Sequence, residues 1–181
     1  LRQELPVALS DKRYDHCLRT ARFAMGLCLS EGIAPGKGYL AGLSHDLARE
    51  WPDDKIFEYA LKDGIKIKKF QKKKPVLLHG RAAAQYLREK YSYAEDDVLE
   101  AVQFHTLGKP GMGTLGKILF CADYLEPGRK YVNDTFRKSL ETKNIDEKVA
   151  AIIEHAVGRN KRLAEQTRGL YHETRGKKVD P

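Results

Sequence analysis

The sequence predicts an all-α protein built as a single helical bundle. Apolar residues recur at helical spacing along most of the chain, whereas alternation with a period of two is confined to the short segment GIKIKKF. Residues typical of helix ends bound several of these segments, for example Ser10 before one and Pro127-Gly128 after another. A chain of 181 residues can bury a core without disulfides. We therefore expect one domain over residues 1–181.

Three helices are predicted in the first third of the chain. Ser10 can cap a helix over residues 10–31, whose broad apolar stripe indicates burial. A second helix over residues 37–50 ends where Pro52 disfavours helix in the residue before it. Pro52 and the acidic residues after it suit the first turn of a third helix, which ends at Gly64.

Four further helices are predicted after the lysine-rich segment. Pro75 opens a helix that runs to about Tyr91, and acidic residues start another over residues 95–105. A glycine-rich loop then leads to a helix over residues 114–125, which the sequence EPG closes. The last long helix spans about residues 146–165 and has one apolar face. These elements make up the expected bundle.

The formal net charge of +8 at pH 7 is concentrated in two places. Residues 66–74 read KIKKFQKKK, and NKRLAEQTRG near the C-terminus adds further positive charge. This distribution suggests a polyanionic partner, although a lysine run is also common on a solvated face. Charge alone does not distinguish a nucleotide from a nucleic acid, so both are candidate partners.

Cysteine usage indicates a reducing compartment. Cys17, Cys28 and Cys121 are an odd number, show no CxxC spacing and each lie in an apolar stretch, as buried small hydrophobic residues do. No apolar run approaches the roughly 20 residues that span a bilayer, and the first residues lack the apolar core of a signal peptide. We expect a soluble, cytoplasmic protein with no membrane partner.

Five polar residues stand on or beside helix faces that should be buried: His16, His45, Asp46, His105 and Asp123. A lone histidine on an apolar face is usually a hydrogen-bonded core residue, and a buried carboxylate is costly unless it is paired or metal-bound. Several such residues on separate helices indicate a shared site instead. Two histidines and two aspartates suit zinc, iron or manganese and leave positions open for water and substrate, whereas structural zinc sites more often use cysteine.

The sequence motifs around these residues resemble those of a known family. YDHCLRTA around His16, GLSHDLA around His45-Asp46 and ILFCADYLEP around Asp123 resemble the HD superfamily of metal-dependent phosphohydrolases. LLHGRAAA around His79, FHTLGKPGM around His105 and ADYLEPGR resemble its YqeK subgroup, bacterial hydrolases that cleave diadenosine tetraphosphate symmetrically to two ADP. The resemblance covers roughly residues 12 to 130 and implies an HD-type helical bundle with that activity.

The resemblance implies roles for six of these residues. His16, His45, Asp46 and Asp123 would hold a divalent metal, for which iron is the first choice and manganese, cobalt or magnesium the alternatives. The metal would activate a water molecule for attack on phosphorus. Asp46, His79 and His105 are the catalytic candidates, and the two extra histidines would complete a second metal position or bind substrate phosphate. We favour the phosphate role here, and one or two ions remain open.

Four further residues are predicted to contact the substrate. Arg19 lies one helical turn after His16, and Arg129 follows the turn after the Asp123 helix, so each guanidinium could bind phosphate. Gly80 and Thr106 could offer a backbone N–H and a hydroxyl. Together with His79 and His105, these residues are the predicted substrate contacts.

Other functions fit parts of the same pattern. The same metal ligands could serve an HD-type hydrolase of a deoxynucleoside monophosphate or a guanosine alarmone. A non-catalytic, basic RNA-binding module would use the lysines of residues 66–74, but it leaves the inward carboxylates unexplained. A diiron oxygenase is disfavoured because nothing marks an oxidisable substrate. The chain also lacks GxSxG and GxxxxGK[ST], so neither a serine nucleophile nor a Walker loop is expected. A homodimer is left open, and nucleic acid is not the preferred partner.

Overall fold

The computed structural model describes residues 3–159 and 162–176, and this part of the chain is helical, with no strand. Its helices, in chain order, are α1 (Leu5–Ala8), α2 (Asp11–Ser30), α3 (Pro35–Ser44), α4 (Asp53–Leu61), α5 (Lys69–Lys73), the 3-10 helix η1 (Pro75–Leu78), α6 (His79–Tyr91), α7 (Asp96–Phe104), α8 (Thr114–Leu125), α9 (Asp134–Ser139), α10 (Ile145–Gly158) and α11 (Glu165–Thr174). The all-α prediction is confirmed. No helix in the described ranges is both long and apolar enough to cross a membrane.

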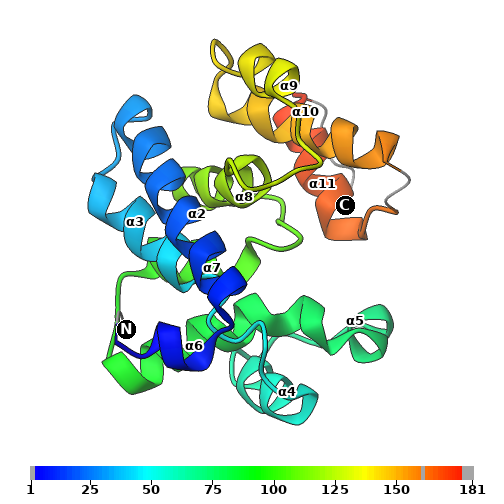
Figure 1. Ribbon diagram of the computed structural model, residues 1–181. Coiled ribbons are helices and arrows are strands. Elements are labelled where there is room, and N and C mark those ends of the chain that lie inside the picture. Colours follow the sequence, from blue (N-terminus) through cyan, green and yellow to red (C-terminus); the bar gives the residue numbers. More distant parts are fainter. Residues whose placement is uncertain (1–2, 160–161, 177–181) are drawn as a thin grey trace.

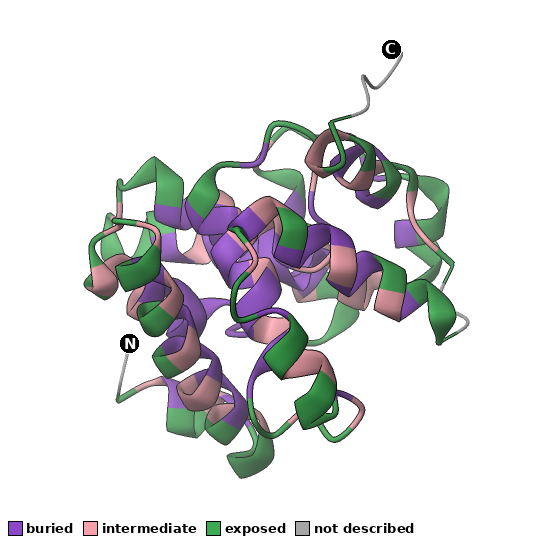
Figure 2. Ribbon diagram, turned by 90° about the horizontal axis from the view of Figure 1, so that it is seen from above, coloured by how far each residue is buried: buried purple, intermediate pink, exposed green. Residues whose placement is uncertain are grey.

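Helix α8 lies at the middle of the molecule, between α2 and α3 on one side and α10 on another (Figure 1). Its apolar face supplies several core residues, among them Ile118, Leu119 and Ala122, which are fully buried. Burial of such side chains contributes roughly 1.5–3 kcal/mol for each large aliphatic residue. Figure 2 shows that the buried residues gather at the centre of the bundle, where the helices meet.

Helices α2 and α3 pack with their backbones unusually close together. A Cβ atom at Gly42 of α3 would lie 2.5 Å from the Cα atom of Ala21 in α2. A side chain at Gly38 would likewise lie 2.5 Å from the sulfur of Cys28. The two glycines therefore permit the approach that brings the C-terminal end of α3 against α2.

A second part of the bundle, made of α4, α5 and α6, lies below α7 in Figure 1. Arg81 of α6 is 5% exposed and donates to both carboxylate oxygens of Asp63, at 2.6 Å each. The same guanidinium donates to the carbonyl oxygens of Ala60 and Ile65. Because these acceptors extend from the end of α4 to the residue before the lysine-rich segment, Arg81 holds this stretch of chain onto α6.

The predicted helix boundaries hold best where end signals are strong. The helix over residues 114–125 is confirmed as α8, and that over residues 10–31 corresponds to α2. The predicted helix over residues 37–50 is too long, because α3 ends at Ser44 and residues 45–50 form turns. The helix predicted over residues 146–165 is also too long, since α10 ends at Gly158.

Other elements were not predicted from the sequence. The segment beginning at Pro75 opens with one 3-10 turn before α6 starts at His79. GIKIKKF forms no strand but leads into α5. Helices α1, α9 and α11 were also missed; the first two are of 4 and 6 residues, too short for a recognisable period.

The close contact of α2 and α3 predicts opposite effects for two glycine substitutions. Gly42→Ala should destabilise the fold by about 1–3 kcal/mol, because the new methyl group overlaps the α2 backbone. Gly26→Ala, in the same helix pair, meets nothing within 4 Å and should stabilise α2 by about 0.5–1 kcal/mol. Urea unfolding monitored by circular dichroism measures both values. Equal effects of the two substitutions would contradict the packing described here.

Candidate metal centre

Four histidine and aspartate side chains converge from α2, α8 and the turn after α3. The Nε2 atom of His16 lies 3.2 Å from Nε2 of His45 and 3.0 Å from Oδ1 of Asp123. The Oδ2 atom of Asp46 lies 3.5 Å from His45 Nε2 and 3.7 Å from His16 Nε2. The side chains of His16, His45 and Asp46 are 5% exposed or less, so their ligand atoms face one another away from solvent.

A second group forms on the other oxygen of the same aspartate. His79 Nε2 lies 2.8 Å from Asp46 Oδ1, and His105 Nε2 lies 3.9 Å from it. The two Nε2 atoms are 3.0 Å apart, and both rings are almost fully buried. Asp46 therefore stands between two sets of ligand atoms, one on each carboxylate oxygen.

Three of the histidines are oriented by the same local contact, a hydrogen bond from Nδ1 to a backbone carbonyl oxygen. His45, His79 and His105 each follow the end of a helix and place Nδ1 at 2.5–2.8 Å from the carbonyl oxygen three residues earlier. A carbonyl oxygen only accepts, so Nδ1 carries a proton in each ring and Nε2 is the nitrogen directed to the centre. At a helix end such a carbonyl lies within reach of a side chain three residues later, which is the position that these histidines occupy.

His16 is oriented by Glu126 instead. Its Nδ1 atom lies 3.1 Å from Glu126 Oε1, and the carboxylate also accepts from Arg19 Nε at 2.6 Å and from the Gly128 N–H at 2.6 Å. Burial tends to raise the pKa of Glu126, but these three donors lower it to about 2. The ionised carboxylate thus holds the proton on His16 Nδ1 and directs Nε2 towards Asp123.

The charges of the centre favour bound cations. Burial opposes ionisation of Asp46, yet His45 and His79 hold the pKa of its carboxyl well below its usual value. Burial also opposes the charged form of His45, but the carboxylates of Asp46 and Asp123 raise its pKa well above the usual value. Metal binding at these atoms would displace the histidine proton, as metal sites generally do. The pKa of His105 falls to about 3 because it is buried beside His79 and His45, so its ring is neutral.

The residues present fit a divalent transition metal. His16, His45 and Asp123 form one group of ligand atoms within 4.8 Å of one another, and Asp46, His79 and His105 form another. Nitrogen and carboxylate oxygen are the ligands that zinc, iron and manganese accept in proteins, and each histidine has the outer partner typical of metal sites. Cys17 also lies near His45 and Asp46, but burial raises the pKa of its thiol to about 11, which leaves it protonated.

A cavity of about 580 Å³ opens onto this centre. Asp46, His79, His105 and Asp123 line it, so the cavity reaches the whole second group and the Asp123 carboxylate of the first. Another part of its lining is apolar and comes from α8 and α10, namely Phe120, Tyr124, Ile152, Ile153 and Ala156. A volume of this size is typical of sites for small molecules and cofactors.

The predicted substrate contacts separate into two pairs. Arg129 and Thr106 line the cavity; Arg129 forms an ion pair with Asp123, and the Thr106 hydroxyl lies 3.1 Å from His105 Nε2. Arg19 is turned to Glu126 and is not part of the lining. Gly80 is buried where a Cβ atom would lie 2.6 Å from the Val102 carbonyl oxygen, so it allows α6 and α7 to bring their histidines together.

Sequence reasoning missed several parts of the site. Arg13 donates to Asp46 Oδ2 at 2.7 Å, and its position three residues before His16 was an available signal. Glu126 was considered only as part of a helix end. The apolar wall from α10 could not be assigned because nothing in its sequence indicates that it faces the ligands.

Comparison with known proteins identifies the family. The HD domain matches residues 13–128, which include all six ligand candidates. The chain belongs to the HD domain family. HD domain hydrolases are metal-dependent, in agreement with the two groups of ligand atoms.

Relatives of this HD domain protein include named phosphohydrolases. The symmetrical bis(5'-nucleosyl)-tetraphosphatase of Halalkalibacterium halodurans is 33% identical over 123 residues, which are 68% of this chain and 65% of that protein. The enzyme of the same name from Bacillus subtilis is 29% identical over 135 residues, or 74% and 72% of the two chains. A probable nicotinate-nucleotide adenylyltransferase/Ap4A hydrolase of Mycoplasma genitalium is 30% identical over 126 residues, 70% of this chain but 35% of that longer protein. The match thus spans slightly less than two thirds of the first of these relatives.

A solved structure shares the complete fold. The crystal structure of a predicted HD superfamily hydrolase involved in NAD metabolism, from Clostridium acetobutylicum, superposes with a TM-score of 0.85 at 29% sequence identity. The similarity covers 96% of this chain and 94% of that one. It therefore includes α10 and α11, which lie beyond the matched HD domain.

The position of Glu126 predicts a loss of metal affinity on substitution. Glu126→Ala should weaken binding of a divalent metal by about 10–100-fold, because His16 loses the partner that fixes its tautomer. Glu126→Gln keeps an acceptor for His16 Nδ1 and should lose less. Calorimetric titration of the metal-free protein with Fe²⁺ or Mn²⁺ measures these affinities, and an unchanged affinity in the alanine variant would show that Glu126 does not position His16.

Proposed function

We propose that this HD domain protein is a metal-dependent phosphohydrolase that cleaves diadenosine tetraphosphate symmetrically to two ADP. The observation that carries this proposal is the set of buried histidine and aspartate ligand atoms that face one cavity with both cationic and apolar lining. The relatives that bear the name of symmetrical bis(5'-nucleosyl)-tetraphosphatase support the choice of substrate. The unpaired, buried cysteines suit action in the reducing cytoplasm.

The metal proposed for the centre is iron, with manganese, cobalt or magnesium as alternatives. His16, His45, Asp46 and Asp123 would hold it. Such an ion supplies Lewis acidity towards phosphoryl oxygen and lowers the pKa of a bound water molecule.

The histidines of the second group suit a metal better than a phosphate. His79 and His105 each donate the Nδ1 proton to a backbone carbonyl oxygen, so in the neutral ring the lone pair is on Nε2. Phosphate oxygens are acceptors and gain nothing from such a lone pair, whereas a cation does. This favours a second ion beside Asp46 Oδ1 over the phosphate role that the sequence led us to prefer.

The remaining cavity residues would act on the substrate. Arg129 can neutralise phosphoryl oxygens beside Asp123, since guanidinium binds phosphate in a bidentate fashion. The Thr106 hydroxyl can donate to an oxygen beside His105. Water is the nucleophile, because the only cysteine near the ligands, Cys17, is a protonated and buried thiol. The water oxygen bonds to phosphorus, and the bond from that phosphorus to the bridging oxygen breaks. The water protons are released or remain on the two ADP products.

The products formed from a panel of nucleotides test the proposal. The metal-loaded protein should convert diadenosine tetraphosphate to ADP alone, detected by ion-exchange chromatography, and should act far more slowly on deoxynucleoside monophosphates and guanosine tetraphosphate. Release of ATP with AMP would contradict symmetrical cleavage. Release of a nucleoside and inorganic phosphate from a monophosphate as the fastest reaction would support the alternative HD-type hydrolase.

Asp46 predicts the sharpest loss of activity. Asp46→Asn should lower kcat by at least about 100-fold, because one carboxylate serves both groups of ligands. Circular dichroism should show unchanged helicity. Asp97→Asn is the matched control, since Asp97 is exposed and pairs with Lys37 far from the cavity. Full activity in the Asp46 variant would show that the centre lies elsewhere.

A further inference from the structure

Arg13, Arg49 and Lys74 are three of the five cations that line the cavity, with Arg129 and Arg162. Arg13 comes from α2, Arg49 from the turns after α3, and Lys74 from the residue between α5 and η1. Each lies close in sequence to a ligand: Arg13 precedes His16 by three residues, Arg49 follows Asp46 by three, and Lys74 precedes His79 by five. We refer to Arg13, Arg49 and Lys74 as the basic cradle.

Arg13 has a donor that nothing in the described chain satisfies. Its Nη1 atom donates to Asp46 Oδ2, but its Nε atom is buried and has no hydrogen-bond partner. A carboxylate oxygen of Glu50 lies 4.0 Å from this Nε, beyond hydrogen-bonding distance, and Glu50 already accepts from the backbone N–H and the hydroxyl of Ser10. A buried N–H without an acceptor is destabilising, and an anion in the cavity would relieve that cost.

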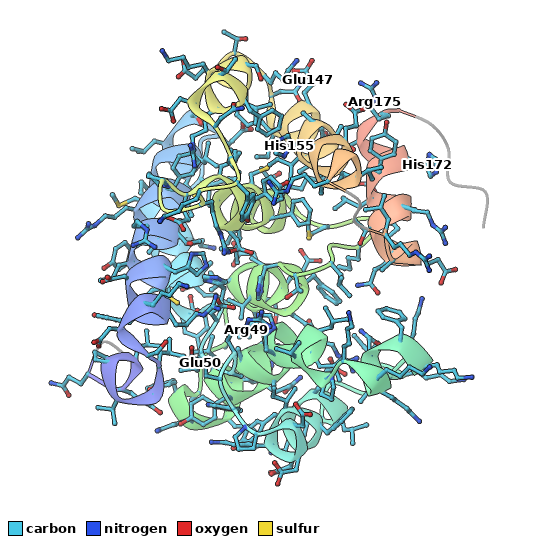
Figure 3. The ribbon with its side chains drawn as sticks, turned by 45° about the vertical axis from the view of Figure 1, so that its right-hand side comes forward. Arg49, Glu50, Glu147, His155, His172 and Arg175 are labelled. Carbon is cyan, nitrogen blue, oxygen red and sulfur yellow. The ribbon has the colours of Figure 1, made fainter. Side chains whose placement is uncertain are left out.

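The charges of Arg49 and Lys74 are not neutralised by the described part of the chain. Within the described ranges, neither side chain forms a hydrogen bond or an ion pair with a carboxylate. Exposed lysines elsewhere do find such partners: Lys62 lies 2.8 Å from Glu89, and Lys90 lies 2.7 Å from Glu4. Figure 3 places Arg49 near the middle of the molecule, with Glu50 next to it. The cradle therefore presents surplus positive charge to the cavity.

Lys74, at the end of α5, and the α10 part of the apolar lining lie on different sides of α8. Helix α10, which carries Ile152, Ile153 and Ala156, packs on one side of α8, whereas α5 and α6 lie on the other side (Figure 1). An apolar wall with aromatic residues suits a nucleoside, and a cluster of cations suits phosphate. A polyphosphate that starts at the apolar wall and crosses the ligand atoms therefore continues into the cradle.

We propose that Arg13, Arg49 and Lys74 bind the phosphates beyond the scissile bond and thereby select the length of the polyphosphate chain. This inference rests on the proposed hydrolysis of a dinucleotide. Symmetrical cleavage of a tetraphosphate places two phosphates in the cradle, whereas cleavage of a triphosphate at the same distance from the first nucleoside leaves one there. The cradle thus contributes more to the tetraphosphate than to the triphosphate.

Two substitutions and a control test this assignment. Arg49→Gln and Lys74→Gln should each lower kcat/KM for diadenosine tetraphosphate about tenfold, and lower that for diadenosine triphosphate less. Arg49→Lys should recover part of the loss. Lys72→Gln removes the same charge from α5 at an exposed position outside the cavity lining and should leave both values unchanged.

A binding measurement separates this inference from the proposed function. Calorimetric titration of the metal-loaded protein with inorganic diphosphate should show an affinity about tenfold weaker in Arg49→Gln and Lys74→Gln, with metal content unchanged. Diphosphate affinity equal to that of the unaltered protein, or equal losses for the two dinucleotides, would overturn the cradle. Failure of the unaltered protein to cleave either dinucleotide would overturn the proposed function, while the diphosphate titration would still decide on the cradle.

Discussion

The buried carboxylate of Asp46 is the constraint on which the rest of the structure depends. An ionised carboxylate that is 3% exposed is tolerated only where positive charge or hydrogen-bond donors surround it. Its Oδ2 atom faces His16, His45 and Arg13, and its Oδ1 atom faces His79 and His105. The helices that carry these residues must therefore meet around the turn that follows α3.

The sequence meets this constraint with two recurring devices. Histidines placed just after a helix end bind the carbonyl oxygen three residues earlier through Nδ1, which orients the ring without any dedicated side chain. Glycines at Gly42 and Gly80 then remove the Cβ atoms that would keep neighbouring helices apart. Together these devices place six ligand side chains around one small volume and leave a cavity on one side for substrate.

The ligands could be predicted from the sequence because they are polar residues on helix faces that are otherwise apolar. His16 and Asp123 stand on or beside apolar helix faces, and the sequence motifs around them match a known family. Helical spacing and family resemblance therefore select the same residues as ligands. The ending of α3 at Ser44 could not be predicted, because it depends on the His45 side chain binding the Gly42 carbonyl and on the tertiary contacts of Asp46.

Contacts between distant segments explain what the sequence left undecided. Arg19 lies on the turn after His16, as expected, but it pairs with Glu126, 107 residues away along the chain. The apolar wall of α10 belongs to the site only because α10 packs on α8. Neither contact produces a recognisable pattern in the local sequence, because both depend on how distant helices pack together.

Anomalous diffraction from metal-loaded crystals tests the central claim most directly. Data collected at the absorption edge of the bound metal should show a peak within about 2.0–2.3 Å of the Nε2 atoms of His16 and His45 and of carboxylate oxygens of Asp46 and Asp123. A second peak between Asp46, His79 and His105 would mark the second ion. A metal bound elsewhere on the molecule, with no peak among these side chains, would contradict the account.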